Sequence, residues 1–106
     1  MRNKMYSIVI PEEQLYFVNI IGVLESKKNI IEYLVVIHEK PTVAPHYHIF
    51  MEFDEPIERK TLECWFKGCE VLFNVIYDKR CCISYMLDSN LQHVRVIGKK
   101  NAKETL

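Results

Sequence analysis

The sequence has little glycine, no excess of charge of either sign and no long apolar run. Lys plus Arg and Asp plus Glu number 14 each among 106 residues. This balance excludes a strongly basic nucleic-acid-binding surface over the whole protein and an acidic tail, but not a local basic patch. No apolar run reaches the ~18 residues of a membrane span, and no signal-peptide core or cleavage site follows the N-terminus. The sequence therefore predicts a soluble, non-secreted, intracellular protein with no membrane partner.

Two chemical motifs are also missing. The chain has no GxxxxGK[ST] segment, which excludes a P-loop ATPase. It has no CxxC pair, although it contains Cys64, Cys69, Cys81 and Cys82. Without CxxC spacing or signs of export, these residues are predicted to be reduced, partly buried thiols. A zinc site or a disulfide is the alternative.

The length and the apolar and charged fractions, 49% and 26%, are typical of one globular domain over residues 1–106. Alternation, turn residues and helix-capping residues predict eight elements. The expected strands are 4–10, 30–38, 46–53, 70–77 and 92–97, and the expected helices are 12–24, 58–66 and 79–87. Residues 98–106 are expected to fray. This order predicts an α+β fold, a central antiparallel sheet of about five strands with helices on one face and the other face open.

Histidines gather on the predicted open face. In the strand 46–53, alternation places His46, His48 and Glu52 on one face and apolar side chains on the other. If the strand 30–38 forms a hairpin with it, His38 lies on the same face. Three neutral imidazoles would leave open positions on a divalent ion, which is typical of a catalytic metal site. The alternative is a set of polar surface histidines.

Three short segments, in the same order along the chain, resemble a known family. His46-Tyr47-His48, followed by an apolar strand, is similar to the His–hydrophobe–His motif of HUH endonucleases. Upstream, His38-Glu39-Lys40 resembles the His-Asp-Lys segment of plasmid rolling-circle replication initiators. About forty residues later, Tyr85-Met86-Leu87 resembles the Tyr-Leu-Thr segment that carries their nucleophile. The resemblance covers nearly the whole chain and implies a ferredoxin-like or RRM-like HUH fold.

The resemblance implies a metal-dependent nicking domain with one catalytic tyrosine. Such domains cut single-stranded DNA at a replication origin and stay joined to the new 5′ end through a phosphotyrosine. His38, His46 and His48 match the ligands of Mn²⁺ or Mg²⁺, and Tyr85 matches the nucleophile. Tyr77 is the main competing tyrosine. Other replication proteins are further candidate partners.

Two positions depart from the family pattern. Pro41 stands where the plasmid initiators often have an acid, so a fourth ligand would come from Glu39 or Glu52. Asp88 stands where related viral initiators have Lys, which leaves Lys79 as the candidate helper cation.

Cations near both ends of the chain are the candidate DNA-binding residues. If the first and last strands come close, these cations form one basic rim that contacts phosphates. They are Arg2, Lys4, Arg95, Lys99, Lys100 and Lys103, with Lys79 as a further candidate. Three other functions stay open: a non-catalytic nucleic-acid-binding domain, a single-tyrosine HUH transposase, and a metal-binding protein with no nucleic-acid role.

Overall fold

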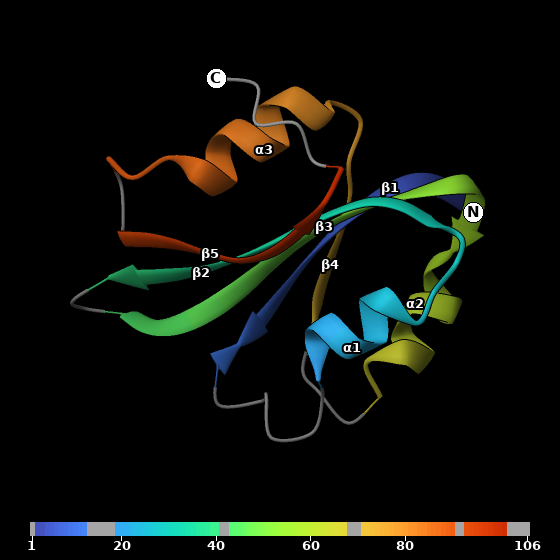
Figure 1. Ribbon diagram of the computed structural model, residues 1–106, viewed down its shortest axis with the longest axis horizontal. Helices are drawn as coiled ribbons and strands as arrows, with labels where there is room; N and C mark the ends of the chain where they lie inside the picture. The colour runs from blue at the N-terminus through green and yellow to red at the C-terminus, as the bar shows by residue number, and fades with distance from the viewer. Residues whose placement is uncertain (1, 13–18, 41–42, 68–70, 91–92, 102–106) are drawn as a thin grey trace.

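The computed structural model describes residues 2–12, 19–40, 43–67, 71–90 and 93–101. Strands and helices follow one another in the predicted order (Figure 1). The elements are β1 (Arg2–Pro11), α1 (Ile20–Glu25), β2 (Ile30–Lys40), β3 (Val43–Glu58), α2 (Arg59–Trp65), β4 (Leu72–Val75), α3 (Lys79–Leu87) and β5 (His93–Lys100). The predicted fold class, α+β with a five-stranded antiparallel sheet, is confirmed.

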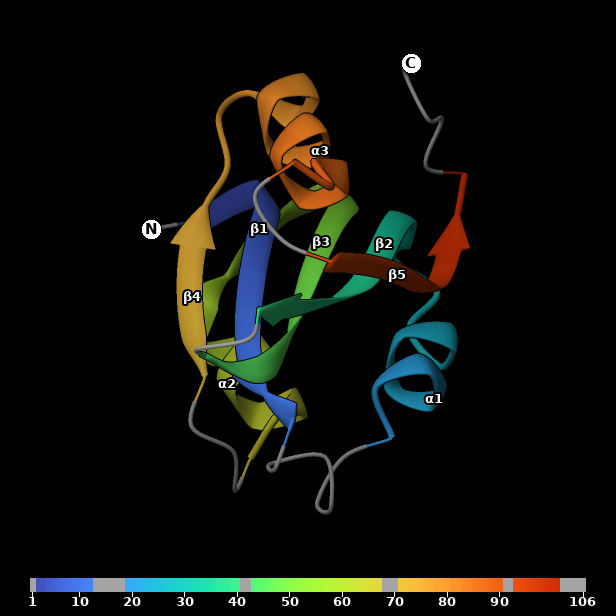
Figure 2. The same cartoon turned by 90° about the vertical axis from the view of Figure 1, so that its left-hand side faces the viewer.

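The sheet has the strand order β4-β1-β3-β2-β5, and all neighbouring strands are antiparallel (Figure 2). β3 occupies the centre and pairs with β2 on one side and β1 on the other. The predicted central pairing of the second and third strands is therefore confirmed. Two strands, β3 and β2, lie between β1 and β5, so the first and last strands do not meet.

Helices cover both faces of the sheet, which corrects the expectation of one open face. α1 and α2 lie on one side, and α3 lies on the other (Figure 1). The reason is that the second face is apolar as well, because Leu34, Val36 and Phe50 point to it. Ile83 and Met86 of α3 bury these three side chains in a second, smaller core. Leaving them exposed would cost roughly 1.5–3 kcal/mol for each side chain.

The larger core lies between the sheet and the pair α1 and α2. Its buried members come from three strands, both helices and the C-cap of α2: Tyr6, Ile8, Ile10, Ile20, Leu24, Ile30, Tyr33, Val35, Ile49, Met51, Phe53, Leu62 and Phe66. The alternation that the sequence predicts for the central strand, with Ile49, Met51 and Phe53 on the helix side, is confirmed. This buried layer lies beneath the opposite face of the sheet, where the histidines lie.

α1 begins later than the sequence predicts. Within the described residues its N-cap is Asn19, whose Oδ1 accepts a hydrogen bond from the Gly22 backbone N–H at 2.9 Å. An Asn side chain at this position satisfies one of the free N–H groups of the first turn. Glu12, the expected start of the helix, directly follows β1, and residues 13–18 of the predicted helix lie outside the described residues.

Two strands extend beyond their predicted ends because a neighbour pairs with the added residues. β3 continues through the expected turn at 54–56 to Glu58, which is paired with Arg2 of β1. β5 continues to Lys100, within the stretch that the sequence predicts to fray, because Gly98 and Lys99 pair with β2. The last five residues of the predicted tail lie outside the described chain.

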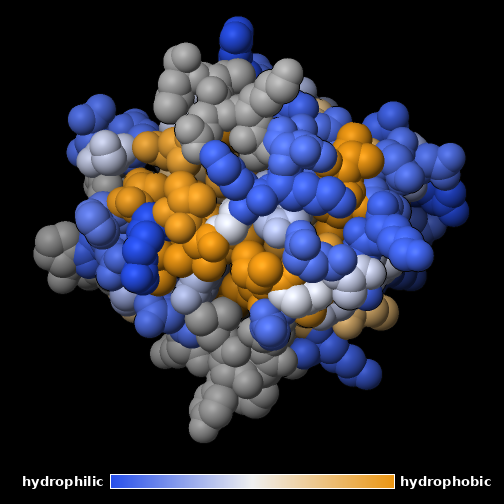
Figure 3. All heavy atoms as spheres, viewed as in Figure 1, coloured by the Kyte–Doolittle hydropathy of each residue, from blue (hydrophilic) through white to orange (hydrophobic). Residues whose placement is uncertain are grey.

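Part of the molecular surface is apolar. In the view of Figure 1, apolar side chains emerge among hydrophilic ones over the region between α3 and α1 (Figure 3). Val96 and Ile97 of the edge strand β5 are exposed apolar residues. The β5 edge is therefore less covered than the sheet centre. Within the described ranges, no helix combines the length and apolar character that crossing a membrane requires.

Candidate functional site

The three predicted histidines lie together on the α3 face of the sheet. His38 of β2 is the cross-strand partner of His46 in β3, and His48 follows two residues later on the same face. The ring centroid of His38 lies 5.3 Å from that of His46 and 5.5 Å from that of His48. The planes are nearly perpendicular in both pairs. His38 therefore stands at the centre of this histidine cluster.

A backbone carbonyl of α3 fixes the chemical state of His38. The ring Nε2 lies 2.8 Å from the carbonyl oxygen of Met86, and a carbonyl only accepts, so Nε2 carries the proton and donates it. Nδ1 of the neutral ring then carries no proton and has an unshared lone pair. This atom is buried and has no hydrogen-bond partner among the described residues. An unpaired buried polar atom of this kind is rare and indicates a missing partner.

Burial keeps two of the rings uncharged. It lowers the pKa of His48 from its ordinary value of 6.5 to about 4, and the neighbouring His38 and His46 act in the same direction. The pKa of His38 is also lowered, mainly by burial, against the raising effect of its bond to Met86. Both imidazoles are therefore neutral at pH 7 and have a free lone pair.

α3 places Tyr85 beside the cluster. Asp78 caps the helix as the sequence predicts, accepting a hydrogen bond from the Cys81 N–H at 3.0 Å. Ile83 and Met86 anchor α3 to the sheet, so Tyr85 lies at the margin of the contact and stays 51% exposed. Its ring centroid is 6.1 Å from that of His38 and 5.9 Å from that of His48. The phenol thus faces both the imidazoles and the solvent.

The donor chemistry of the cluster fits a divalent ion. Imidazole nitrogens are common ligands of transition metals, and His38 offers an unused, buried lone pair. With the rings in their present orientations, no three His, Cys, Asp or Glu side chains in the described part of the chain are grouped as metal ligands. Binding an ion at Nδ1 of His38 would therefore require the His46 and His48 rings to turn from their edge-to-face packing, while the bond to Met86 holds the His38 ring.

The two candidate acids do not join the cluster. Glu39 follows His38 and so alternates to the opposite face of β2. Glu52 shares the face of His48 but lies four residues further along β3, roughly 13 Å away at the usual strand rise. A fourth ligand from either acid is therefore not supported by the geometry.

Glu52 instead takes part in an ion-pair network that also holds Lys79. The Lys79 Nζ lies 2.9 Å from Glu52 Oε1 and 3.0 Å from Glu32 Oε1. Glu32 and Glu52 are cross-strand partners, so their carboxylates repel each other unless a cation lies between them. Lys79 thus ties the first turn of α3 to the sheet and does not face the histidines as a helper cation. Sequence reasoning missed Glu32, although its place on the face of His38 was a usable signal.

Replacing Lys79 by Met is expected to lower the free energy of unfolding by roughly 1–3 kcal/mol, because two largely buried carboxylates lose their cation. The Glu32 and Glu52 side chains are only 13% and 20% exposed. Urea unfolding at pH 7 measures the change.

The matched control is Arg2→Met, which breaks the exposed ion pair with Glu58 at 3.5 Å. Exposed pairs are worth roughly 0–1 kcal/mol, so this loss should be clearly smaller. Equal losses in the two variants would show that Lys79 does not stabilise the docking of α3.

The predicted basic rim does not form. Arg2 and Lys4 lie on β1, whereas Arg95, Lys99 and Lys100 lie on β5, and β3 and β2 separate the two strands. Arg2 pairs with Glu58, and Lys100 donates a hydrogen bond to the Ile30 carbonyl at 2.9 Å. Lys103 lies outside the described residues. The cations therefore form two groups at different parts of the surface.

The described cysteines are free thiols, but only Cys82 is partly buried as predicted, whereas Cys64 and Cys81 are exposed. Cys64, Cys81 and Cys82 form no disulfide, and Cys69 lies outside the described residues. Burial raises the pKa of Cys82 to about 11, and a hydrogen bond to the Asp78 carboxylate raises the pKa of Cys81. Both thiols of the adjacent pair are therefore protonated at pH 7, which disfavours a role as thiolate ligands or nucleophiles.

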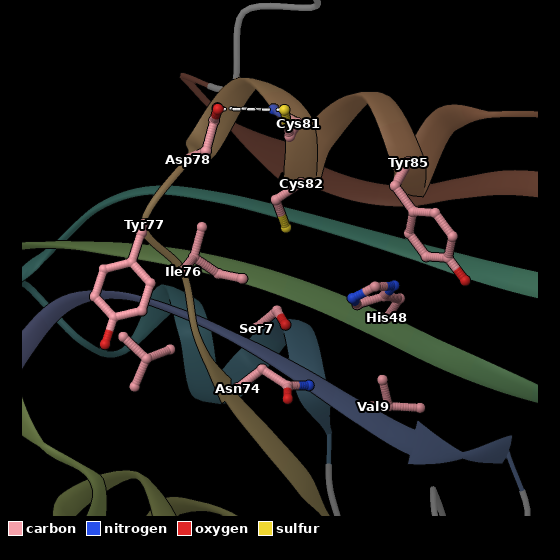
Figure 4. A pocket seen from close by; sticks show the side chains of 11 residues that line it. Ser7, Val9, His48, Asn74, Ile76, Tyr77, Asp78, Cys81, Cys82 and Tyr85 are labelled. Carbon is pink, nitrogen blue, oxygen red and sulfur yellow. Dashed lines mark hydrogen bonds between the residues drawn. The ribbon is translucent and has the colours of Figure 1, made fainter.

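A hollow of about 500 Å³ opens beside Tyr85 and His48. Figure 4 shows the Tyr85 ring above it, Ser7 and Asn74 below it, and His48 at one end. Sequence reasoning missed Ser7 and Asn74 as site residues. They meet because β4 pairs with β1, with Asn74 opposite Ser7, and no local pattern predicts this long-range register.

Comparison of the sequence with protein-family models and with curated proteins yields no match, so the fold and the site are the observations from which a function is argued.

Proposed function

We propose that the protein is a metal-dependent endonuclease that nicks single-stranded DNA and joins itself to the new 5′ end through Tyr85. The cut site would be the origin of a rolling-circle replicon. The observation that carries the proposal is the placement of one half-exposed phenol next to three clustered imidazoles, with ring centroids 5.3–6.1 Å apart. The HUH-like order of these residues in the sequence supports the same function.

The chain's own residues account for the covalent step. The Tyr85 hydroxyl oxygen attacks the phosphorus of a phosphodiester, forming an O–P bond while the bond from phosphorus to the 3′-oxygen breaks. The phenol loses its proton to solvent, which its 51% exposure allows, and the departing 3′-oxygen takes up a proton. The bond energy is kept in the phosphotyrosine, so a 3′-hydroxyl can later reverse the step and rejoin the strand.

His38, His46 and His48 would hold the divalent ion, Mn²⁺ or Mg²⁺. When bound, the ion supplies positive charge that neutralises a non-bridging phosphate oxygen. The protein contributes neutral rings, since burial lowers the pKa of His38 and His48. The hydrogen bond from His38 to Met86 sets the tautomer and thereby leaves Nδ1 free as the donor atom.

The proposal is tested on a denaturing gel. The protein is incubated with a pool of single-stranded oligonucleotides and Mn²⁺, with and without EDTA. We expect a DNA-linked protein band that requires the metal.

Metal binding is measured separately by calorimetry on the same protein. Metal binding without any adduct across a diverse pool would overturn the nuclease and favour a binding-only domain. Adduct formation in EDTA would overturn the metal requirement while leaving the covalent step in place.

A further inference from the structure

The hollow beside Tyr85 is lined by three strands (β1, β3 and β4), by the segment between β4 and α3, and by α3 itself. Val9 of β1 is the cross-strand partner of His48, and Ser7 of β1 is the partner of Asn74. These strands form the floor, α3 forms one wall, and Tyr77 stands at the rim opposite His48 (Figure 4). α3 covers the β2 and β3 part of this face and leaves the β1 and β4 part open.

The lining of the hollow suits a planar, uncharged, hydrogen-bonding group. Among the described residues that line it, none is Lys or Arg, so it offers no cation to a phosphate. It does offer two exposed aromatic rings, Tyr85 and the 82% exposed Tyr77. The Asn74 amide carries donors and an acceptor, and the Ser7 hydroxyl carries both. Aromatic faces with an amide at the edge are the chemistry that binds an unpaired nucleobase.

The hollow and the histidine cluster share two residues, His48 and Tyr85. Any base that enters the hollow therefore belongs to a nucleotide close to the phosphate that Tyr85 attacks. We infer that the hollow binds one unpaired base next to the scissile phosphate, with Tyr77 stacking on it and Asn74 reading its edge. This inference rests on the proposed nicking function. It makes Asn74 a specificity-determining residue, and the hollow's volume of about 500 Å³ lies in the usual range of ligand sites.

In the test, the protein cuts a randomised pool of single-stranded DNA. Both DNA products are then sequenced, so that the bases on either side of the nick are known. Wild-type protein is expected to prefer one base at a position next to the nick. Asn74→Leu is expected to reduce that preference roughly tenfold, the value of one well-formed amide–base contact. Preferences at distant positions should be unchanged.

The control variant is Asn90→Leu, which alters an exposed Asn beyond the end of α3. It should keep the wild-type preference. Thermal unfolding of each variant establishes that it folds, which is expected for Asn74 because its side chain is exposed on the edge strand β4.

Tyr77 is tested by two variants that separate its ring from its hydroxyl. Tyr77→Leu should slow adduct formation roughly tenfold, since one stacking contact is lost, and Tyr77→Phe, which restores the stacking ring, should rescue that loss.

An unchanged base preference in Asn74→Leu, with adducts still forming, would overturn this inference and leave the nuclease intact. Absence of adducts from the wild-type protein would overturn the nuclease itself and this inference with it.

Discussion

Tyr85→Phe is expected to abolish the covalent protein–DNA adduct completely while leaving the fold and DNA binding unchanged. The substitution removes a single oxygen, and that oxygen is the atom that would bond to phosphorus. The ring remains beside His38 and His48, so its edge-to-face contacts persist. Because Tyr85 is half exposed, no buried hydrogen-bond partner is lost, and the free energy of unfolding should change by less than about 0.5 kcal/mol.

The measurement pairs the denaturing gel with fluorescence anisotropy of a labelled oligonucleotide. Tyr77→Phe is the matched control, since Tyr77 lines the same hollow but lies at the rim opposite His48. It should form the adduct at the wild-type rate. If Tyr85→Phe still forms adduct and Tyr77→Phe does not, the nucleophile is Tyr77. If both variants react, the covalent bond involves neither phenol.

The fold was predictable from the sequence where local patterns decide it. Alternation predicts which side chains of β3 point to each face of the sheet, and Asp78 predicts the start of α3. Both predictions depend only on residues that are close in the sequence. The position of α3 on the second face could also be predicted. Leu34 and Phe50 lie on the face of the histidines and must be shielded from water. The expectation of an open face is wrong because these apolar side chains lie beside the histidines and are buried by Ile83 and Met86 of α3. The start of α1 after the Asn19 N-cap is not predicted, because Leu15 and Val18 continue the apolar helical spacing before Asn19.

The site was predictable in part. A hairpin between β2 and β3 places His38 opposite His46, and the observed register has this pairing. The approach of Tyr85 depends on how α3 crosses the sheet, and the sequence supports it only through the family resemblance. The prediction of a basic rim is wrong because strand order is set by long-range pairing. Here β1 lies next to β3 and β5 lies next to β2. The contact between Ser7 and Asn74 has the same long-range origin.

The histidine cluster should also make the metal-free protein sensitive to acid. His48 is 8% exposed, and burial lowers its pKa from 6.5 to about 4. The unfolded chain therefore takes up a proton near pH 6.5, whereas the folded chain takes one up only near pH 4. Protons thus favour the unfolded state throughout this window, and the stability that is present above pH 6.5 is lost as the pH falls toward 4.

The expected loss from His48 alone is about 3 kcal/mol between pH 7 and pH 4, at ~1.4 kcal/mol for each unit of pKa shift. His38 acts in the same direction, since its pKa is also lowered. The measurement is urea unfolding in EDTA at a series of pH values, so that no bound ion contributes. The same series is recorded for His48→Leu, which cannot take up a proton.

The difference in unfolding free energy between His48→Leu and wild type should grow as the pH falls, because carboxylates that titrate in both proteins cancel. His93→Leu, at an exposed position of β5, controls for the removal of a histidine and should keep the wild-type pH dependence. Parallel curves for wild type and His48→Leu would mean that His48 is not held neutral by burial. Its lone pair would then be protonated in mildly acidic solution, and the cluster would lose metal near pH 6. If the difference in unfolding free energy does grow, the metal-free His48 ring stays unprotonated well below neutral pH. The unprotonated ring is the state that metal binding requires.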